Sequence, residues 1–429
     1  MSERDVIAGI YRRVAFGVTP GELDRLEALG IDGVIDRLVD PDAHGVDAAP
    51  VDLWAGLELP PLDSYGQALA INGRWFDALI VTPRPFHEWM AWYWHGHLVS
   101  GLNGAFAVEM IVQLNLFRRS GLGSFADLLR AVTVGAAMLR YLDGDQNEGT
   151  NPNENYSREV LELFALGIGN YTQDDIVAGA RALSGWRIDL LSGPSPSDPA
   201  RPRVYFDPSR HNDAPQRYLG RADVHDVDTV VDAIVNHEAC APFVASRFGR
   251  AVLGPEADPG LLADLGRRFQ DADLNLSVLS RAVLEALAEG HGTGLLLAPM
   301  PWLVAAQRAT GAILSDDYRS SSLFASGQFP LFPPNVVGWP GGRQWLASSA
   351  ITERFNLASA LASAAPPTNT AKQAAAEGDL PALADALGHP AGFSQPTTAA
   401  LEELRRSVGL RDGVELLAVA LASPDLVMA

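Results

Sequence analysis

Residues 152–167 read PNENYSREVLELFALG, and this stretch indicates most clearly which kind of fold the chain adopts. When the residues are projected at about 100° each, one stripe of the surface is polar and the opposite face is apolar. The polar stripe consists of Asn155, Arg158, Glu159 and Glu162, and the apolar face of Tyr156, Val160, Leu163 and Phe164. Asn153 is suited to cap such a helix, and Glu154 suits the positive end of its dipole. The stretch therefore predicts an amphipathic helix.

The same periodicity recurs over most of the chain. It predicts helices over 5–16, 31–38, 64–82, 84–97, 103–120, 124–133, 154–167, 172–184, 227–236, 240–251, 258–271, 275–289, 299–311, 351–363, 397–405 and 412–422. Thr19 and Pro20 predict one more helix start, as N-cap and first helical residue. The stretch Ser363–Thr370, rich in Ala and Pro, indicates a low-complexity joint.

Two segments lack the helical pattern, and they set the predicted organisation. Residues 185–225 indicate an irregular insertion with at most a small β-hairpin near 185–206, and residues 326–348 indicate a loop dense in Gly, Pro and Trp. We therefore predict a mostly α fold, a single multi-helix globular domain over 1–429. Its subregions are an N-terminal helical half (1–184), the insertion, and a C-terminal helical half (226–429).

The composition disfavours several classes of function. A net charge of −20 and a pI near 4.8 disfavour binding to nucleic acid or to anionic membranes. Lys372 is the sole lysine, which argues against lysine-based catalysis, and the sole cysteine, Cys240, lies in an apolar context typical of a core residue. No apolar run approaches the ~20 residues of a membrane helix, so no membrane insertion is expected. No signal peptide is recognisable, which predicts a cytoplasmic protein.

The first candidate site is the aromatic stretch Trp89–His97, which contains His95 and His97. Two imidazoles can bind one metal ion, but residues two apart point about 200° from each other in a continuous helix. They could therefore share an ion only if the helix ends at Gly96. The alternatives are two hydrogen-bonded structural histidines, or metal-free acid–base groups.

The second candidate site is the polar segment 141–162. Its candidate residues are Asp143, Glu154, Asn155, Arg158, Glu159 and Glu162. They form either a solvated face with an Arg158–Glu162 ion pair, or the wall of a pocket. Paired carboxylates serve acid–base chemistry when their surroundings separate their pKa values, and they also bind metals.

Two further segments are weaker candidates. His211-Asn-Asp213 follows the expected hairpin and is typical of a surface turn. The loop 327–345 contains Trp339, whose flat face beside Asn335 and Gln328 suits carbohydrate or other ring-shaped ligands. The sequence contains no phosphate-binding Gly-rich loop ending in Lys-Ser/Thr, no dinucleotide fingerprint, no Gly-x-Ser-x-Gly and no His-Glu-x-x-His.

Over roughly residues 5–425, these segments, in this order, resemble the bacterial domain of unknown function 1800 family. The matching stretches are Arg13–Pro20, Trp94–His97, Asn153–Leu163, Tyr171–Thr172, Ala180–Trp186, His211 and Phe332–Gly342. The resemblance implies a mostly helical bacterial protein, and it supplies no catalytic residues. It also implies that relatives are often exported. The lack of a recognisable signal peptide in this sequence differs from that pattern.

The leading functional hypothesis is a hydrolase-like enzyme with a His/carboxylate pocket and a small-molecule or glycan-like substrate. Its acid–base residues would be Glu159 and Glu162, with Asp143 and Glu154 as further candidates. Arg158, Asn155, Trp339 and Asn335 would bind substrate, and His95, His97 and His211 would hold a divalent Zn, Fe or Mn ion. The alternatives are a non-catalytic binding or partner protein in which the polar cluster is structural, and a metal-dependent redox enzyme.

Overall fold

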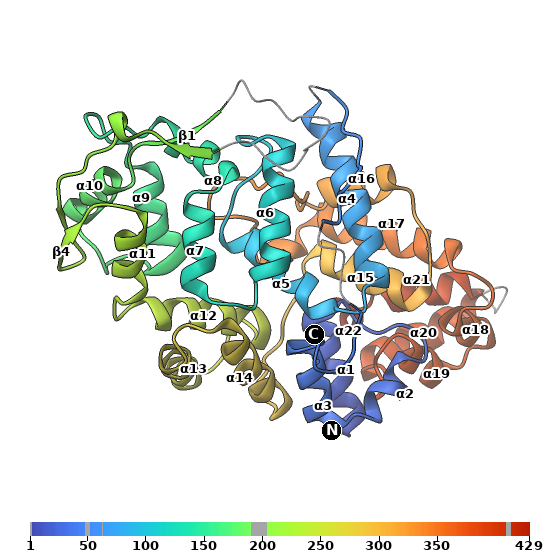
Figure 1. Ribbon diagram of the computed structural model, residues 1–429. Helices are drawn as coiled ribbons and strands as arrows, with labels where there is room; N and C mark the ends of the chain where they lie inside the picture. The colour runs from blue at the N-terminus through green and yellow to red at the C-terminus, as the bar shows by residue number, and fades with distance from the viewer. Residues whose placement is uncertain (1, 48–51, 62, 190–203, 409–412) are drawn as a thin grey trace.

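The computed structural model describes residues 2–47, 52–61, 63–189, 204–408 and 413–429 (Figure 1). The helices of the N-terminal part are α1 Glu3–Val14, α2 Glu22–Glu27, α3 Gly30–Val39, α4 Ser64–Val81, α5 Pro85–His97, α6 Ala107–Ser120, α7 Phe125–Thr133, α8 Ala136–Tyr141, η1 Gly144–Gln146, α9 Asn155–Glu159, η2 Val160–Ala165 and α10 Gln173–Ala182. The strands and the short helix among them are β1 Trp186–Ile188, β2 Val204–Phe206, η3 Pro208–Arg210, β3 Gln216–Tyr218 and β4 Arg221–Val224.

The remaining helices complete the chain. They are α11 Val227–Val235, α12 Cys240–Leu253, α13 Pro259–Asp271, α14 Leu276–Ala288, α15 Pro299–Thr310, α16 Asp316–Ala325, η4 Gly342–Leu346, α17 Ser348–Ala364, α18 Thr370–Glu377, α19 Leu380–Ala386, α20 Gln395–Val408, α21 Val414–Ala422 and α22 Pro424–Val427. The mostly α prediction is therefore confirmed. None of the helices within the described ranges has both the length and the apolar character of a membrane span.

Contacts between residues that are far apart in the sequence join the two ends of the chain. One continuous group of buried apolar side chains extends from Ile7 in α1 to Val427 in α22. In Figure 1 the two termini lie close together, beside α1 and α22. The buried guanidinium of Arg13 explains part of this closeness, because it donates hydrogen bonds to the backbone oxygens of Val252, Thr293 and Ala429. An arginine that donates to several main-chain acceptors stabilises such a junction.

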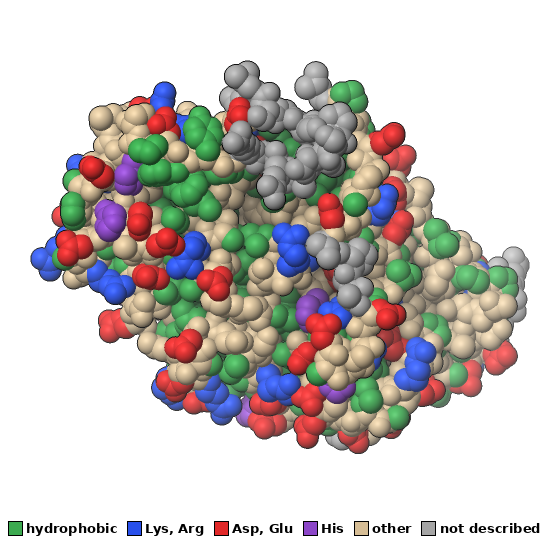
Figure 2. All heavy atoms as spheres, in the orientation of Figure 1, with side chains coloured by type: hydrophobic (Ala, Val, Ile, Leu, Met, Phe, Trp, Pro, Cys, Tyr) green, Lys and Arg blue, Asp and Glu red, His purple; other side chains and the backbone are tan. Residues whose placement is uncertain are grey.

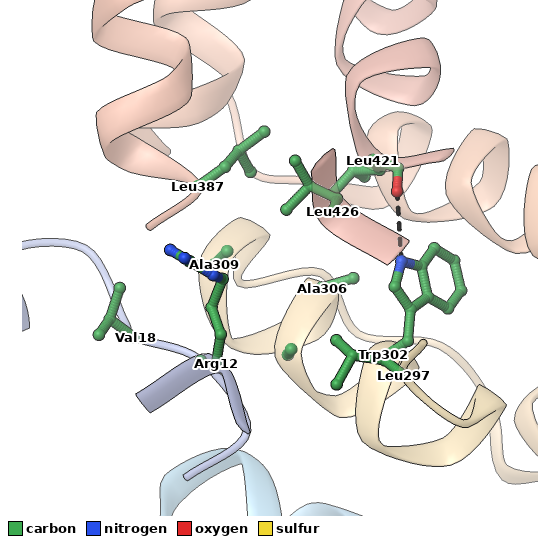
Figure 3. Close-up of a pocket in the computed structure, with 11 residues that line it drawn as sticks. Arg12, Val18, Leu297, Trp302, Ala306, Ala309, Leu387, Leu421 and Leu426 are labelled. Atoms are coloured by element: carbon green, nitrogen blue, oxygen red, sulfur yellow. Dashed lines mark hydrogen bonds between the residues drawn. The ribbon is translucent and has the colours of Figure 1, made fainter. Parts of the chain in front are cut away.

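The same junction encloses a small cavity between α1, α15 and the C-terminal helices (Figure 3). Arg12, Leu387 and Leu426 are among its lining residues, and Trp302 at its edge donates a hydrogen bond from Nε1 to the oxygen of Leu421. Its volume of about 20 Å³ has room for about one water molecule. This cavity is therefore too small to be a ligand site.

The predicted hairpin is confirmed, and a second strand pair accompanies it. β1 pairs antiparallel with β2, with Ile188 opposite Val204, while residues 190–203 lie outside the described residues. β3 pairs antiparallel with β4 and was not predicted, because its residues lack an alternating apolar pattern. Leu219 and Gly220 connect β3 to β4 with φ values of 48° and 77°, the left-handed pair that a tight hairpin turn requires.

Several local predictions need correction. The helices α8, α16, α18, α19 and α22 were missed, and the last residue of the joint, Thr370, is the first residue of α18. α2 begins at Glu22 and not at Pro20, because Gly21 has a left-handed φ of 72° that does not fit inside a right-handed helix. Cys240 is buried as predicted, and burial raises the pKa of its thiol to about 12.

Candidate functional site

The largest cleft that we identify has a volume of about 920 Å³ and lies between α5, α12, the segment 294–298 and the loop 339–346. Its aromatic lining residues are Trp89, Trp92, Tyr93, Trp339 and Trp345. Its charged lining residues are Arg13, Arg247, Arg250, Arg343 and Glu256. The volume is within the range of about 300–1,000 Å³ that small-molecule sites have. We therefore take this cleft as the candidate functional site.

The aromatic wall follows from the helical spacing of α5. Residues three and four apart share a helix face, so Trp89, Trp92, Tyr93 and His97 lie near one another. Trp89 stacks on Tyr93 with ring centroids 5.9 Å apart, and Tyr93 stacks on His97 at 5.8 Å. The helix thus presents a continuous series of ring faces and edges to the cleft.

The opposite wall is the Gly/Pro/Trp-rich loop, which packs directly against the end of α5. Trp339 stacks on Trp92 with ring centroids 5.5 Å apart. Gly338, with φ of 89°, allows this approach, because a Cβ atom there would lie 2.8 Å from the backbone oxygen of Gly96. The backbone N of Leu331 also donates to Nε2 of His95 at 3.2 Å. These contacts bring the sequence segments 89–97 and 327–345 together.

The charge of the cleft differs from that of the whole chain. Figure 2 shows acidic and basic side chains intermixed over one face of a molecule whose net charge is −20. In the cleft, four arginines stand beside one acidic side chain, Glu256. Arg13 and Arg250 donate to main-chain oxygens, Arg250 to that of Pro255 at 2.6 Å, and neither pairs with an acidic side chain of the described residues. The cleft is therefore suited to a ligand with negative charge.

His95 and His97 are both buried, and their contacts are structural. α5 continues through Gly96 to His97, so the condition for a shared metal ion is not met. His95 packs edge-on against Trp75, Trp92 and Trp339, and Nε2 of His97 lies 2.9 Å from the backbone oxygen of Phe164. Burial lowers the pKa of each histidine to about 3, so both are neutral at pH 7. Of the two, His97 lines the cleft and His95 does not.

The candidate carboxylates form a separate polar cluster on α9, η2 and α10. Arg158 pairs with Glu154 at 2.9 Å rather than with Glu162, and Gln173 contacts both partners. Asn155 donates to the carboxylate of Asp143 at 3.2 Å. α9 begins at Asn155 with Glu154 in the cap position, so Asn153, the predicted cap, lies one residue too early; its side chain still accepts a hydrogen bond from the Asn155 backbone.

Glu159 and Glu162 have different surroundings within this cluster. Burial raises the pKa of Glu159, and the nearby charge of Glu162 raises it further. The carboxylate of Glu162 accepts a hydrogen bond of 2.8 Å from the hydroxyl of Tyr171, whose pKa burial and this hydrogen bond raise to about 12. The two carboxyl groups are half-buried, and neither is among the residues that line the cleft.

The other two candidates lie elsewhere. Nδ1 of His211 is 2.9 Å from the backbone oxygen of Ser184, next to the β1–β2 pair. Asn335 is exposed, and its side-chain oxygen accepts a hydrogen bond from the backbone N of Val337 within a turn. Throughout the part of the chain that the structure describes, no group of three or more His, Cys, Asp or Glu side chains is arranged to hold a metal ion.

Sequence reasoning overlooked the arginines of the cleft. Arg247 and Arg250 are three residues apart on α12, so the sequence does predict that they share a helix face. Nothing local indicates that this face lies opposite α5. Arg343 stands in η4, within the loop that we had examined only for its aromatic residues.

Comparison with curated proteins gives no match, and comparison with solved structures gives none either. A family model described as "Protein of unknown function (DUF1800)" matches residues 9–428, nearly the whole chain. This match confirms the resemblance that the motifs Trp94–His97, Asn153–Leu163 and Phe332–Gly342 indicate. The chain belongs to the DUF1800 family.

Proposed function

We propose that the chain is a binding protein for a ring-shaped, sugar-like small molecule, and that this ligand occupies the cleft between α5 and the loop 339–346. The observation that supports the proposal is the group of five aromatic side chains around one cleft of about 920 Å³. Trp92 and Trp339 stack on each other and are both partly exposed, so part of this ring pair is accessible to a ligand. Flat rings bind sugar and aromatic rings by stacking, and neighbouring polar groups such as Gln328 fix the orientation.

Binding agrees better with this cleft than hydrolysis does. Glycoside hydrolysis generally needs two carboxyl groups on either side of the scissile bond. Among the described residues that line the cleft, Glu256 is the one with a carboxylate, and the neutral His97 is in contact with Phe164. The pair Glu159 and Glu162 lies outside that lining.

The test is a titration of intrinsic tryptophan fluorescence with maltotriose, cellotriose and trigalacturonate. We expect at least one of them to bind, and Trp339→Ala to weaken its binding by about 1–2 kcal/mol, or roughly 5–30-fold. Trp186→Ala is the matched control, because Trp186 is also partly exposed but lies on β1, outside the cleft. Absence of binding by all three sugars, or an equal loss in Trp186→Ala, would contradict the proposal.

A second candidate function is acid–base catalysis at Glu159 and Glu162. The raised pKa of Glu159 supports it, since a raised pKa moves a carboxyl group toward the range in which it can act as a general acid. The test measures release of nitrophenol from 4-nitrophenyl glycosides. Activity that Glu159→Gln abolishes, and that Glu289→Gln on the exposed surface leaves unchanged, would support this candidate. Equal rates for the wild type and Glu159→Gln would eliminate it.

A further inference from the structure

Two of the four arginines in the cleft have neither a hydrogen-bond partner nor an ion-pair partner among the described residues. Arg247 is exposed on α12, and Arg343 is exposed in η4 on the opposite wall. Within the described residues, neither guanidinium is hydrogen-bonded or ion-paired to another side chain. In contrast, Arg4, Arg118, Arg140 and Arg319 each pair with a carboxylate. Two free guanidinium groups in one cleft are therefore available to a ligand that enters it.

The position of Arg247 connects it to the aromatic wall. Its positive charge acts on Tyr93 and His97, which lie at the base of the cleft. A guanidinium group presents a planar set of N–H donors that matches the two oxygens of a carboxylate or phosphate. A ligand ring in contact with Trp92 or Trp339 would lie in the same cleft as two such sets of donors, one from α12 and one from η4. The chemistry that complements this arrangement is a sugar ring with an attached oxyanion.

We propose that Arg247 and Arg343 bind the carboxylate or phosphate of an acidic sugar, so that the cleft selects charged sugars over neutral ones. This inference rests on the proposed function, since it assigns a ligand class to the same cleft. Each arginine is a specificity-determining residue: it adds affinity for the charged group and leaves the stacking of the ring unchanged.

The experiment compares ligands that differ only in charge. Trigalacturonate is paired with its methyl ester, which keeps every ring and removes the charge, and glucose 6-phosphate is paired with glucose. Binding to the full chain is measured by titration calorimetry at low and at moderate salt. We expect the charged member of at least one pair to bind about tenfold more tightly, with a preference that falls as salt screens the interaction. The pair that shows the preference identifies the oxyanion as carboxylate or as phosphate.

Variants assign that preference to the two arginines. Arg247→Gln and Arg343→Gln are expected to lower the affinity for the charged ligand toward that of its neutral partner, and to leave neutral binding unchanged. Arg267→Gln is the control, because Arg267 is an exposed arginine on α13 outside the cleft. Equal binding of charged and neutral ligands, or a preference that persists in both variants, overturns the inference and leaves the binding function standing. Failure of all four ligands to bind overturns the proposed function as well.

Discussion

The replacement His97→Phe tests whether this histidine is a buried neutral group. The folded-state pKa of His97 is about 3, because burial disfavours the charged imidazole, whereas an unfolded chain has a histidine pKa of about 6.5. The lowered pKa means that below about pH 6.5 the unfolded state binds a proton that the folded state does not. Stability therefore falls with decreasing pH, by about 1.4 kcal/mol per pH unit for this one group.

The size of the effect follows from these two pKa values. Between pH 7.5 and pH 5, His97 alone should lower the free energy of unfolding of the wild type by about 2 kcal/mol. Phenylalanine has no such proton, but it leaves the backbone oxygen of Phe164 without its buried donor, at a cost of about 1–3 kcal/mol at any pH. The variant should thus have a lower free energy of unfolding than the wild type at pH 7.5. At pH 5 this difference should be smaller by about 2 kcal/mol.

Urea unfolding at several pH values between 7.5 and 5 measures both free energies. His291→Gln is the control, since it replaces a histidine whose side chain is about half exposed. If the difference in free energy of unfolding between the wild type and His97→Phe stays constant over this pH range, His97 is not a buried neutral group. Stoichiometric zinc in the wild type that is lost in the variant would instead restore the metal hypothesis.

Further predictions concern the elements that support the cleft. Glu88→Gln removes the carboxylate that pairs with the buried Arg118 at 2.8 Å, and it should cost about 3–5 kcal/mol in urea unfolding; retention of full stability would contradict the pairing. Gly338→Ala should lower the melting temperature and weaken ligand binding, because the new Cβ atom meets the end of α5 and displaces Trp339. Gly341→Ala is the control, because there is open space around the Cβ position of Gly341, and it should change neither the melting temperature nor ligand binding. Equal effects of Gly338→Ala and Gly341→Ala would show that the close approach of Gly338 to α5 is unimportant.

The helical fold could be predicted from the sequence because most of its helices have an apolar stripe and clear ends. The prediction for α5 was within a residue of the observed bounds, and α7 and α13 were similarly close. The short helices α18 and α19 were missed because alanine-rich segments give little contrast between an apolar and a polar face. The pair β3–β4 was missed because its strands are three and four residues long and mostly polar.

The candidate site could be predicted only in part. The sequence singled out His97 and Trp339, because aromatic and Gly/Pro-rich segments are locally recognisable, and both residues line the cleft. Which segments face one another depends on tertiary packing, so the prediction that Glu159 of α9 and Glu162 of η2 share a pocket with the histidines of α5 had no local basis in the sequence. It overlooked Arg247 because an arginine on a helix surface looks the same whether it faces solvent or a cleft.

The most direct test of the central claim is a crystal structure of the protein with trigalacturonate, at a concentration that saturates binding in solution. The account predicts a sugar ring on the face of Trp92 or Trp339, with a carboxylate group near Arg247 or Arg343. An empty cleft with the sugar bound elsewhere, for example beside Glu159 and Glu162, would contradict it.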